Sequence, residues 1–185
     1  MAKVTVNAKE ILADIKAGMD DTTLAQKHGL SDKELQRVFK QLADAGRLKQ
    51  GESEKRIIPL LTERLMEASL RGNSDVAELL LAKGADINAK DDHGFTALMW
   101  AVVGGHFHAV KLLLDKGADI NAKNNNGQTA LMHAALGGEV DAVKLLLDKG
   151  ADINAKDKDG DTSLMLIPSK AHHEVVELLK AHGAT

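Results

Sequence analysis

The fold is decided by residues 83–90, which read KGADINAK, because this octapeptide returns without a change at 116–123 and again at 149–156. The spacing is 33 residues in both steps. The pair Leu-Met recurs with the same spacing, beginning at residues 65, 98, 131 and 164. A fixed period of this length is typical of proteins built from stacked structural units. We therefore divide the second part of the chain into four units, at 58–90, 91–123, 124–156 and 157–185.

Each of the last three units opens on a predicted turn. The tetrapeptides at 91–94, 124–127 and 157–160 place Asp or Asn first and Gly fourth, which is the preference of a type I turn. The threonines that follow can cap a first short helix; they are Thr96, Thr129 and Thr162.

A second helix is predicted in every unit, and in the second and third units it follows a pair of glycines, Gly104-Gly105 and Gly137-Gly138. Val110, Leu113 and Leu114 have the spacing of an apolar stripe along this helix, and the next unit repeats the pattern. A glycine after the last turn suits a left-handed helix end at Gly84, Gly117 and Gly150. Neither helix is long enough to be stable alone, so the units must stack and bury their apolar faces against one another.

Three runs carry a family resemblance: GFTALM at 94–99, Gly105-His106, and LLDKGADIN at 113–121. Together they resemble the ankyrin repeat. The resemblance covers 58–185 and implies an all-α solenoid of helix-turn-helix units with short β-turn tips. The sequence departs from the family where proline is usual, at Ala97, Ala130 and Ser163, and has Met where histidine is usual after the leucine.

The terminal units depart further from the family pattern. The first lacks the turn and begins with Pro59, Leu60 and Leu61. The last contains Ile167-Pro168, so its first helix is expected to end early, at Ile167. Atypical end units are what a solenoid needs to cap its apolar interior.

Residues 1–50 share none of this repeat and predict a small three-helix module. The helices are expected from Asn7 to Gly18, from Asp21 to His28, and from Ser31 to Ala45, where Ser31 and Glu34 form a capping box. Gly29-Leu30 makes a tight turn between the last two, which gives a helix-turn-helix outline. Residues 51–57 are polar and are expected to be a linker. The N-terminal segment also resembles a helical module found at the N-terminus of some bacterial multi-domain proteins.

Two interpretations of this module stay open. A DNA-binding module would place its third helix in the major groove, with contacts from Lys33, Gln36, Arg37 and Lys40. Asp32 and Glu34 at the leading end of that helix argue against it, and residues 1–57 carry 11 basic and 9 acidic residues, a weak nucleic-acid footprint. The alternative is a helical module whose charges form a solvated face.

Composition excludes several kinds of chemistry. The chain has no cysteine, which removes disulfides, a thiolate nucleophile and Cys-ligated metal sites. Strings that imitate active sites fail: HEVVE at 173–177 lacks the second histidine of a zinc helix, and Asp157, Asp159 and Asp161 lack the later residues of a calcium loop. We expect no enzyme activity, no metal, no cofactor and no small-molecule substrate.

The beginning of the chain lacks the basic-then-apolar pattern of a signal peptide, and no apolar stretch approaches bilayer length. We therefore expect a soluble, cytoplasmic protein without membrane association.

The residues that vary on the repeated scaffold are the candidates for binding. In ankyrin proteins such positions line the turn tips and the concave face, which implies a protein partner. They are Asp92, His93, Phe95, Trp100 and Val103 in the second unit, Asn125, Asn126, Gln128, His133 and Leu136 in the third, and Lys158, Asp159 and Asp161 in the fourth. Phe95 and Trp100 suit an aromatic anchor. The alternatives are a Phe95 ring folded onto its neighbour and a Trp100 used in packing between units.

The repeat region is mildly acidic. Residues 58–185 carry 13 basic and 18 acidic side chains. A partner with basic character would be steered towards this region.

Overall fold

The computed structural model describes residues 8–17, 19, 21–44, 61–168 and 172–185, and these contain helices and turns but no strand. The chain divides into two compact units, residues 1–60 and residues 61–185. The predicted all-α class is confirmed. The linker predicted at 51–57 lies outside the described residues.

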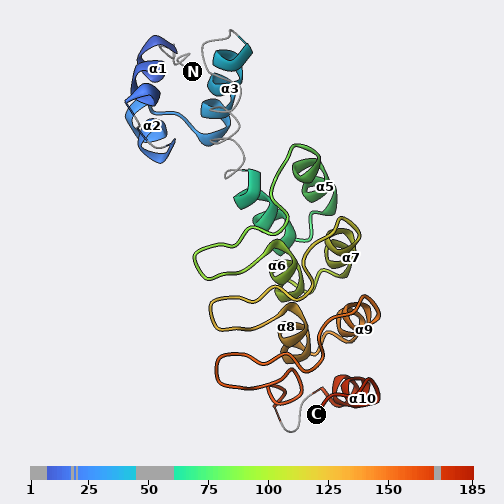
Figure 1. Cartoon of the computed structure of the whole chain (residues 1–185). Coiled ribbons are helices and arrows are strands. Elements are labelled where there is room, and N and C mark those ends of the chain that lie inside the picture. Colours follow the sequence, from blue (N-terminus) through green and yellow to red (C-terminus); the bar gives the residue numbers. More distant parts are fainter. Residues whose placement is uncertain (1–7, 18, 20, 45–60, 169–171) are drawn as a thin grey trace. The chain divides into compact units, whose positions relative to one another are not determined.

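The first unit contains the three predicted helices, labelled in Figure 1: α1 (Ala8–Lys16), α2 (Asp21–His28) and α3 (Asp32–Asp44). Gly29 has φ +62° between α2 and α3, a conformation that costs glycine little. The core draws on all three helices and on the turn after α2. Its buried members are Ile11, Ile15, Leu24, Leu30, Leu35, Val38, Phe39 and Leu42.

Polar side-chain contacts stabilise this unit at two places, between α1 and α2 and at the beginning of α3. The Asp14 carboxylate on α1 accepts from Lys27 Nζ and faces His28 Nε2, each at 2.8 Å, which ties α1 to α2. At the start of α3, the Glu34 carboxylate accepts from the Ser31 N–H at 2.9 Å and from the Ser31 hydroxyl at 2.6 Å. The predicted capping box is therefore half formed, because the hydroxyl binds the carboxylate instead of the Glu34 N–H.

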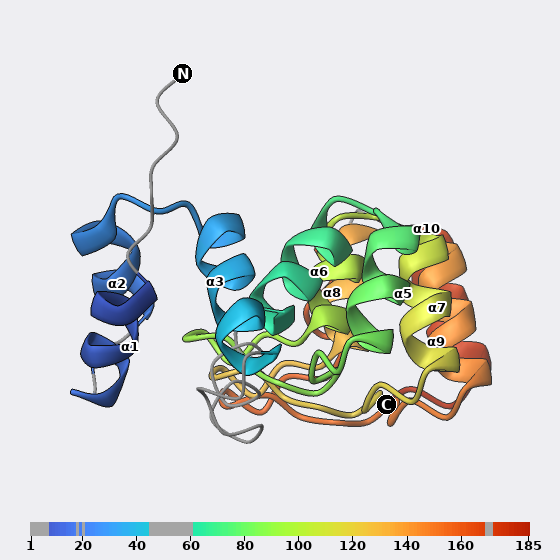
Figure 2. The same cartoon turned by 90° about the horizontal axis from the view of Figure 1, so that it is seen from above.

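The second unit is a stack of helix pairs. Residues 61–70 are helical and precede α5 (Ser74–Ala82). Then come α6 (Ala97–Val103) with α7 (Phe107–Asp115), α8 (Ala130–Gly137) with α9 (Val140–Asp148), and α10 (His173–Ala181). Figure 1 shows α6 and α8 in one row and α5, α7, α9 and α10 in another, and Figure 2 agrees. The connecting loops project from the side of the first helices.

Small and branched residues fill the space between the rows. Ala101, Val110 and Leu113 are fully or almost fully buried, as are Ala134, Val143 and Leu146 at the same positions one unit later. Thr96 Oγ1 and Thr129 Oγ1 accept from the N–H three residues on, each at 3.4 Å, so these two predicted caps are confirmed. The glycines predicted at the ends of the second helices have φ near +90°.

The octapeptide is repeated because each copy binds the next. Asn88 Oδ1 accepts from the Asp119 N–H and Asn121 Oδ1 accepts from the Asp152 N–H, each at 2.8 Å. Lys90 Nζ donates to the carbonyl of Lys123, and Lys123 Nζ donates to that of Lys156, again at 2.8 Å. Two side chains per unit, an asparagine and a lysine, thus bond to backbone groups of the next unit, which favours identical residues at these positions.

The first helix predicted in the fourth unit is not formed. Residues 163–166 make turns, closed by bonds from the N–H groups of Met165 and Leu166 to the Thr162 carbonyl. Pro168 has no N–H and disfavours helical backbone at Ile167, which leaves too few residues for a helix. The Thr162 hydroxyl donates to the Thr185 carbonyl at 3.4 Å and does not cap a helix.

No helix in the described part of the chain is both long and apolar enough to cross a membrane.

Candidate protein-interaction surface

Each turn tip is organised by the side chain of its first residue. Asp91 Oδ1 accepts from the N–H groups of His93 and Phe95, both at 2.9 Å. Asn124 holds the next tip in the same way, and Asp157 the last. The sequence predicted the turns but not that these three side chains accept hydrogen bonds from the backbone of the turn. The preference for Asp or Asn at the first position was the signal that could have indicated this role.

The tips are also bonded to one another. Asn125 Nδ2 donates to the Asp92 carbonyl at 2.8 Å, and the Asn125 N–H donates to the His93 carbonyl at 2.9 Å. One unit further on, the Lys158 N–H donates to the Asn126 carbonyl at 3.0 Å. The three tips therefore form a connected edge, on which the side chains of Asp92, His93, Asn125, Asn126, Lys158 and Asp159 are exposed.

Three rings from two units meet beside this edge. The Phe95 ring lies between Trp100 and His133, with centroid separations of 4.8 and 4.9 Å. Trp100 Nε1 donates to Asp91 Oδ2 at 2.9 Å, so the residue that holds the tip also orients the indole. All three rings are half-buried, which matches the alternative in which Phe95 folds onto its neighbours.

Burial also affects the charge of this stack, because it lowers the pKa of His133 below its ordinary value of 6.5. The imidazole therefore stays neutral at neutral pH. His133 Nε2 lies 3.3 Å from Asn124 Nδ2.

Two further predicted site residues, Gln128 and Asp161, are half-buried at their respective tips.

An exposed apolar row follows the ends of the first helices. Val103 is 50% exposed and Leu136 is 45% exposed, in equivalent positions of the second and third units. Leu70 occupies the same position in the first unit and is 39% exposed. Leu70 was missed as a candidate, although its spacing of 33 residues from Val103 identifies it.

These repeats match a known family. The family model described as ankyrin repeats (3 copies) matches residues 65–157, half of the chain. The chain belongs to the ankyrin repeat family. Ankyrin repeats are generally protein–protein interaction modules, and the family is typically non-enzymatic.

A curated relative supports the match over a shorter stretch. It is the ankyrin repeat domain-containing protein SAT10 of Stachybotrys chartarum, 49% identical over 41 residues. The aligned stretch is 22% of this chain and 2% of that relative, so the chain spans a small part of the relative's length.

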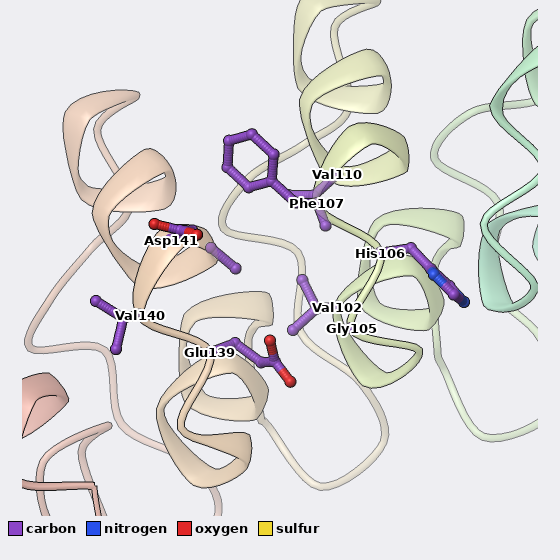
Figure 3. A pocket seen from close by; sticks show the side chains of 9 residues that line it. Val102, Gly105, His106, Phe107, Val110, Glu139, Val140 and Asp141 are labelled. Atoms are coloured by element: carbon purple, nitrogen blue, oxygen red, sulfur yellow. The ribbon is translucent and has the colours of Figure 1, made fainter.

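A cleft lies between the second and third ankyrin units, at the beginning of α7 and α9. Its volume is about 180 Å³, and Val102, Phe107, Val110, Glu139 and Asp141 are among its lining residues. Figure 3 shows the Phe107 ring on the α7 side and the two carboxylates on the α9 side. Sequence patterns did not indicate this cleft.

The other predicted sites have less structural detail. Arg37 is exposed on α3, while the side chains of Lys33, Gln36 and Lys40 are not among those described. Within the described residues, no group of three or more His, Asp or Glu side chains is placed to hold a metal ion.

Proposed function

We propose that this ankyrin repeat chain is a non-catalytic scaffold that binds a protein partner through its turn tips and first helices. One observation carries the proposal: the ring stack of Phe95, Trp100 and His133 lies in the same two units as the exposed Val103 and Leu136. Aromatic side chains with exposed apolar neighbours are typical of the residues that dominate binding energy.

The hydrogen bonds between the tips favour binding because they already order the loops that would contact the partner. The tips are already connected through Asn125 and Lys158, and the Trp100 side chain is held by Asp91. A pre-organised surface loses less conformational entropy on association. Asp92 and Asp159 are exposed acidic residues on this edge, so the proposal includes a partner segment with basic residues.

The test compares two double variants in capture of partner proteins from a lysate of the cells that make the protein. Val103→Ala with Leu136→Ala removes exposed apolar surface and leaves the buried core intact. We expect it to lose proteins that the unmodified chain retains. Phe95→Ala with Trp100→Ala should lose the same proteins while most helical content remains by circular dichroism.

A matched control removes exposed apolar side chains elsewhere. Val76 and Leu79 on α5 are 46% and 56% exposed and lie outside the proposed surface. Val76→Ala with Leu79→Ala should retain the captured proteins. Equal retention by all variants would contradict the proposed surface.

A second candidate function is duplex DNA binding by the first unit, with the repeats sensing a protein. It is favoured by the turn at Gly29 and by the core beneath α3, which leave Arg37 exposed. Glu34 opposes it, because hydrogen bonds from Ser31 lower the pKa of this carboxyl and keep a negative charge at the start of the helix.

Titration of the full chain with duplex DNA over a salt series separates the two functions. Binding that weakens steeply with salt and is lost in Arg37→Ala with Lys40→Ala would support the DNA-binding function. Absence of binding at low salt would exclude it.

A further inference from the structure

The cleft between the second and third ankyrin units has an apolar floor and a charged side. Val102, Val110 and Ala142 form the floor and are almost fully buried. Phe107 stands on the α7 side and is 38% exposed, so its ring is accessible from solvent. Glu139 and Asp141 line the α9 side, with Glu139 half-buried and Asp141 exposed.

Both carboxylates lack a cationic partner within the described residues. Nearby carboxylates on the second helices are paired: Glu78 with Lys116 at 2.8 Å, and Asp115 with Lys149 at 2.9 Å. Glu139 and Asp141 make no such pair. They flank the first residue of α9, where the helix dipole favours negative charge.

One residue that lines the cleft differs in kind from its equivalents in the neighbouring repeats. His106 and His172 occupy equivalent positions, and each ring lies against a glycine of the preceding unit, Gly72 and Gly138 respectively. Glu139 takes this position in the third unit, and its carboxylate lies over Gly105. A flexible acidic side chain therefore stands where the two neighbouring junctions have an imidazole ring.

The combination of ring and carboxylates also differs from the neighbouring junctions. The equivalents of Phe107, Glu139 and Asp141 are Ser74, His106 and His108 at the junction before, and Val140, His172 and Glu174 at the junction after. Neither set combines an aromatic ring with two carboxylates. The second helices α5, α7, α9 and α10 follow one another in a single row across these junctions (Figure 1), so it is the side-chain chemistry that is specific to the second and third units.

We propose that this cleft receives an arginine side chain of a bound protein segment. The aliphatic part of arginine would cover the valine floor, and its guanidinium would stack on Phe107 and bond to the carboxylates. A planar cation with several donors suits a ring beside two acids better than a compact ammonium does. The cleft is smaller than typical small-molecule sites, which fits a single side chain.

The inference rests on the proposed function, because it assumes a protein partner. Its test does not require the partner to be known. The probe is Nα-acetyl-arginine amide, titrated into the isotopically labelled full chain and followed by amide chemical shifts. We expect saturable shifts at Gly105, Phe107, Glu139 and Asp141, with a dissociation constant on the order of millimolar. The neutral citrulline analogue, which has nearly the same shape, should bind at least about tenfold more weakly.

The variant that tests the carboxylates is Glu139→Gln with Asp141→Asn, which keeps the side-chain shapes. It should weaken binding of the arginine probe by about tenfold or more. Phe107→Ser, which introduces the residue found at the equivalent position of the first unit, should also weaken it. Asp75→Asn is the matched control, since Asp75 has the same register position as Asp141 and is exposed on α5.

Absence of saturable shifts would overturn the proposal, and so would equal binding of the citrulline analogue or of the double variant. Failure here is distinguishable from failure of the proposed function. Loss of partner proteins in the Val103 and Leu136 variant, without binding of the arginine probe, would overturn the arginine site alone. Binding of the probe without any dependence of capture on Val103 and Leu136 would overturn the proposed surface and leave the arginine site standing.

Discussion

Ser163 carries a buried hydroxyl that makes no hydrogen bond within the described residues. Ala97 and Ala130 occupy the same position in the two preceding units, where they pack without a polar group. Because burying an unsatisfied hydroxyl is unfavourable, Ser163→Ala should raise the free energy of unfolding by about 1 kcal/mol. Urea denaturation followed by circular dichroism measures this change.

Ser69 provides the control for this prediction. It is also fully buried, but its hydroxyl donates to the Leu65 carbonyl at 2.7 Å. Ser69→Ala removes a satisfied group and should not stabilise the protein. A similar effect of both substitutions would contradict the role given to the missing bond at Ser163.

His133 should make stability depend on pH, because burial lowers its pKa below 6.5 in the folded protein. As the pH falls through about 6.5, the unfolded chain takes up a proton here and the folded chain does not. The unfolded state then binds more protons, so the free energy of unfolding falls until the pH passes below the folded pKa. Denaturation at pH 7.5 and at pH 5.5 measures the fall.

His133→Leu isolates this contribution, since Leu166 occupies the same position in the fourth unit. All other residues are identical in the two proteins, so their contributions to the pH dependence largely cancel in the comparison. The stability of the variant relative to the unmodified chain should therefore rise as the pH is lowered. A difference that stays constant with pH would show that His133 titrates alike in the folded and unfolded states.

The turn tips and the helix ends use glycine for different reasons, which substitution can separate. Gly117 has φ +90° after α7, and a Cβ there would meet no atom within 4 Å. Gly94 has φ +78° at a turn tip, and a Cβ there would lie 2.6 Å from the Asn125 backbone nitrogen. Gly117→Ala should cost about 1 kcal/mol of conformational strain, and Gly94→Ala at least about 1 kcal/mol more.

The same denaturation experiment compares the two glycine variants. The extra loss at Gly94 should come with altered amide shifts at Asn125 and Asn126, because the clash falls on the bonds between neighbouring tips. Equal losses of free energy in the two variants would contradict the predicted clash between Gly94 and the neighbouring tip.

At the level of elements, the helices of the middle units were predictable because several local signals agree there. Thr96 and Thr129 cap their helices as expected, and Gly117 ends α7 as expected. The prediction of a first helix in the fourth unit was wrong because Pro168 prevents the whole helix from forming and does not merely end it early. The sequence shows this proline but not how few residues remain between it and Thr162.

The candidate site was predictable in its positions but not in its contacts. Variation on a fixed scaffold identified Phe95, Trp100 and His133, yet their stacking depends on a ring from the next unit and on the Asp91 carboxylate. The cleft was not predictable, because its lining combines Phe107 with Glu139 and Asp141 of the next unit. A cleft of this kind depends on how the side chains of two units pack against each other. No residue pattern that recurs every 33 positions indicates it.

For the repeat region as a whole, stability should be graded along the stack. Each ankyrin unit contacts its neighbours, so an end unit can open by losing one interface while a central unit must lose two. The fourth unit is further weakened because residues 163–166 are turns. Backbone amides of α10 should therefore exchange with solvent faster than those of α6 and α8, as measured by native-state hydrogen exchange.

One bond allows the gradient to be altered from the end. Asn154 Oδ1 accepts from the Thr185 N–H at 3.1 Å and from its hydroxyl at 3.2 Å, continuing the asparagine contacts made by Asn88 and Asn121. Asn154→Ala should speed exchange in α10 and leave α6 unchanged. Equal acceleration in both helices would mean that the repeats open as a single cooperative unit, because loss of a terminal contact would then lower the stability of every unit alike.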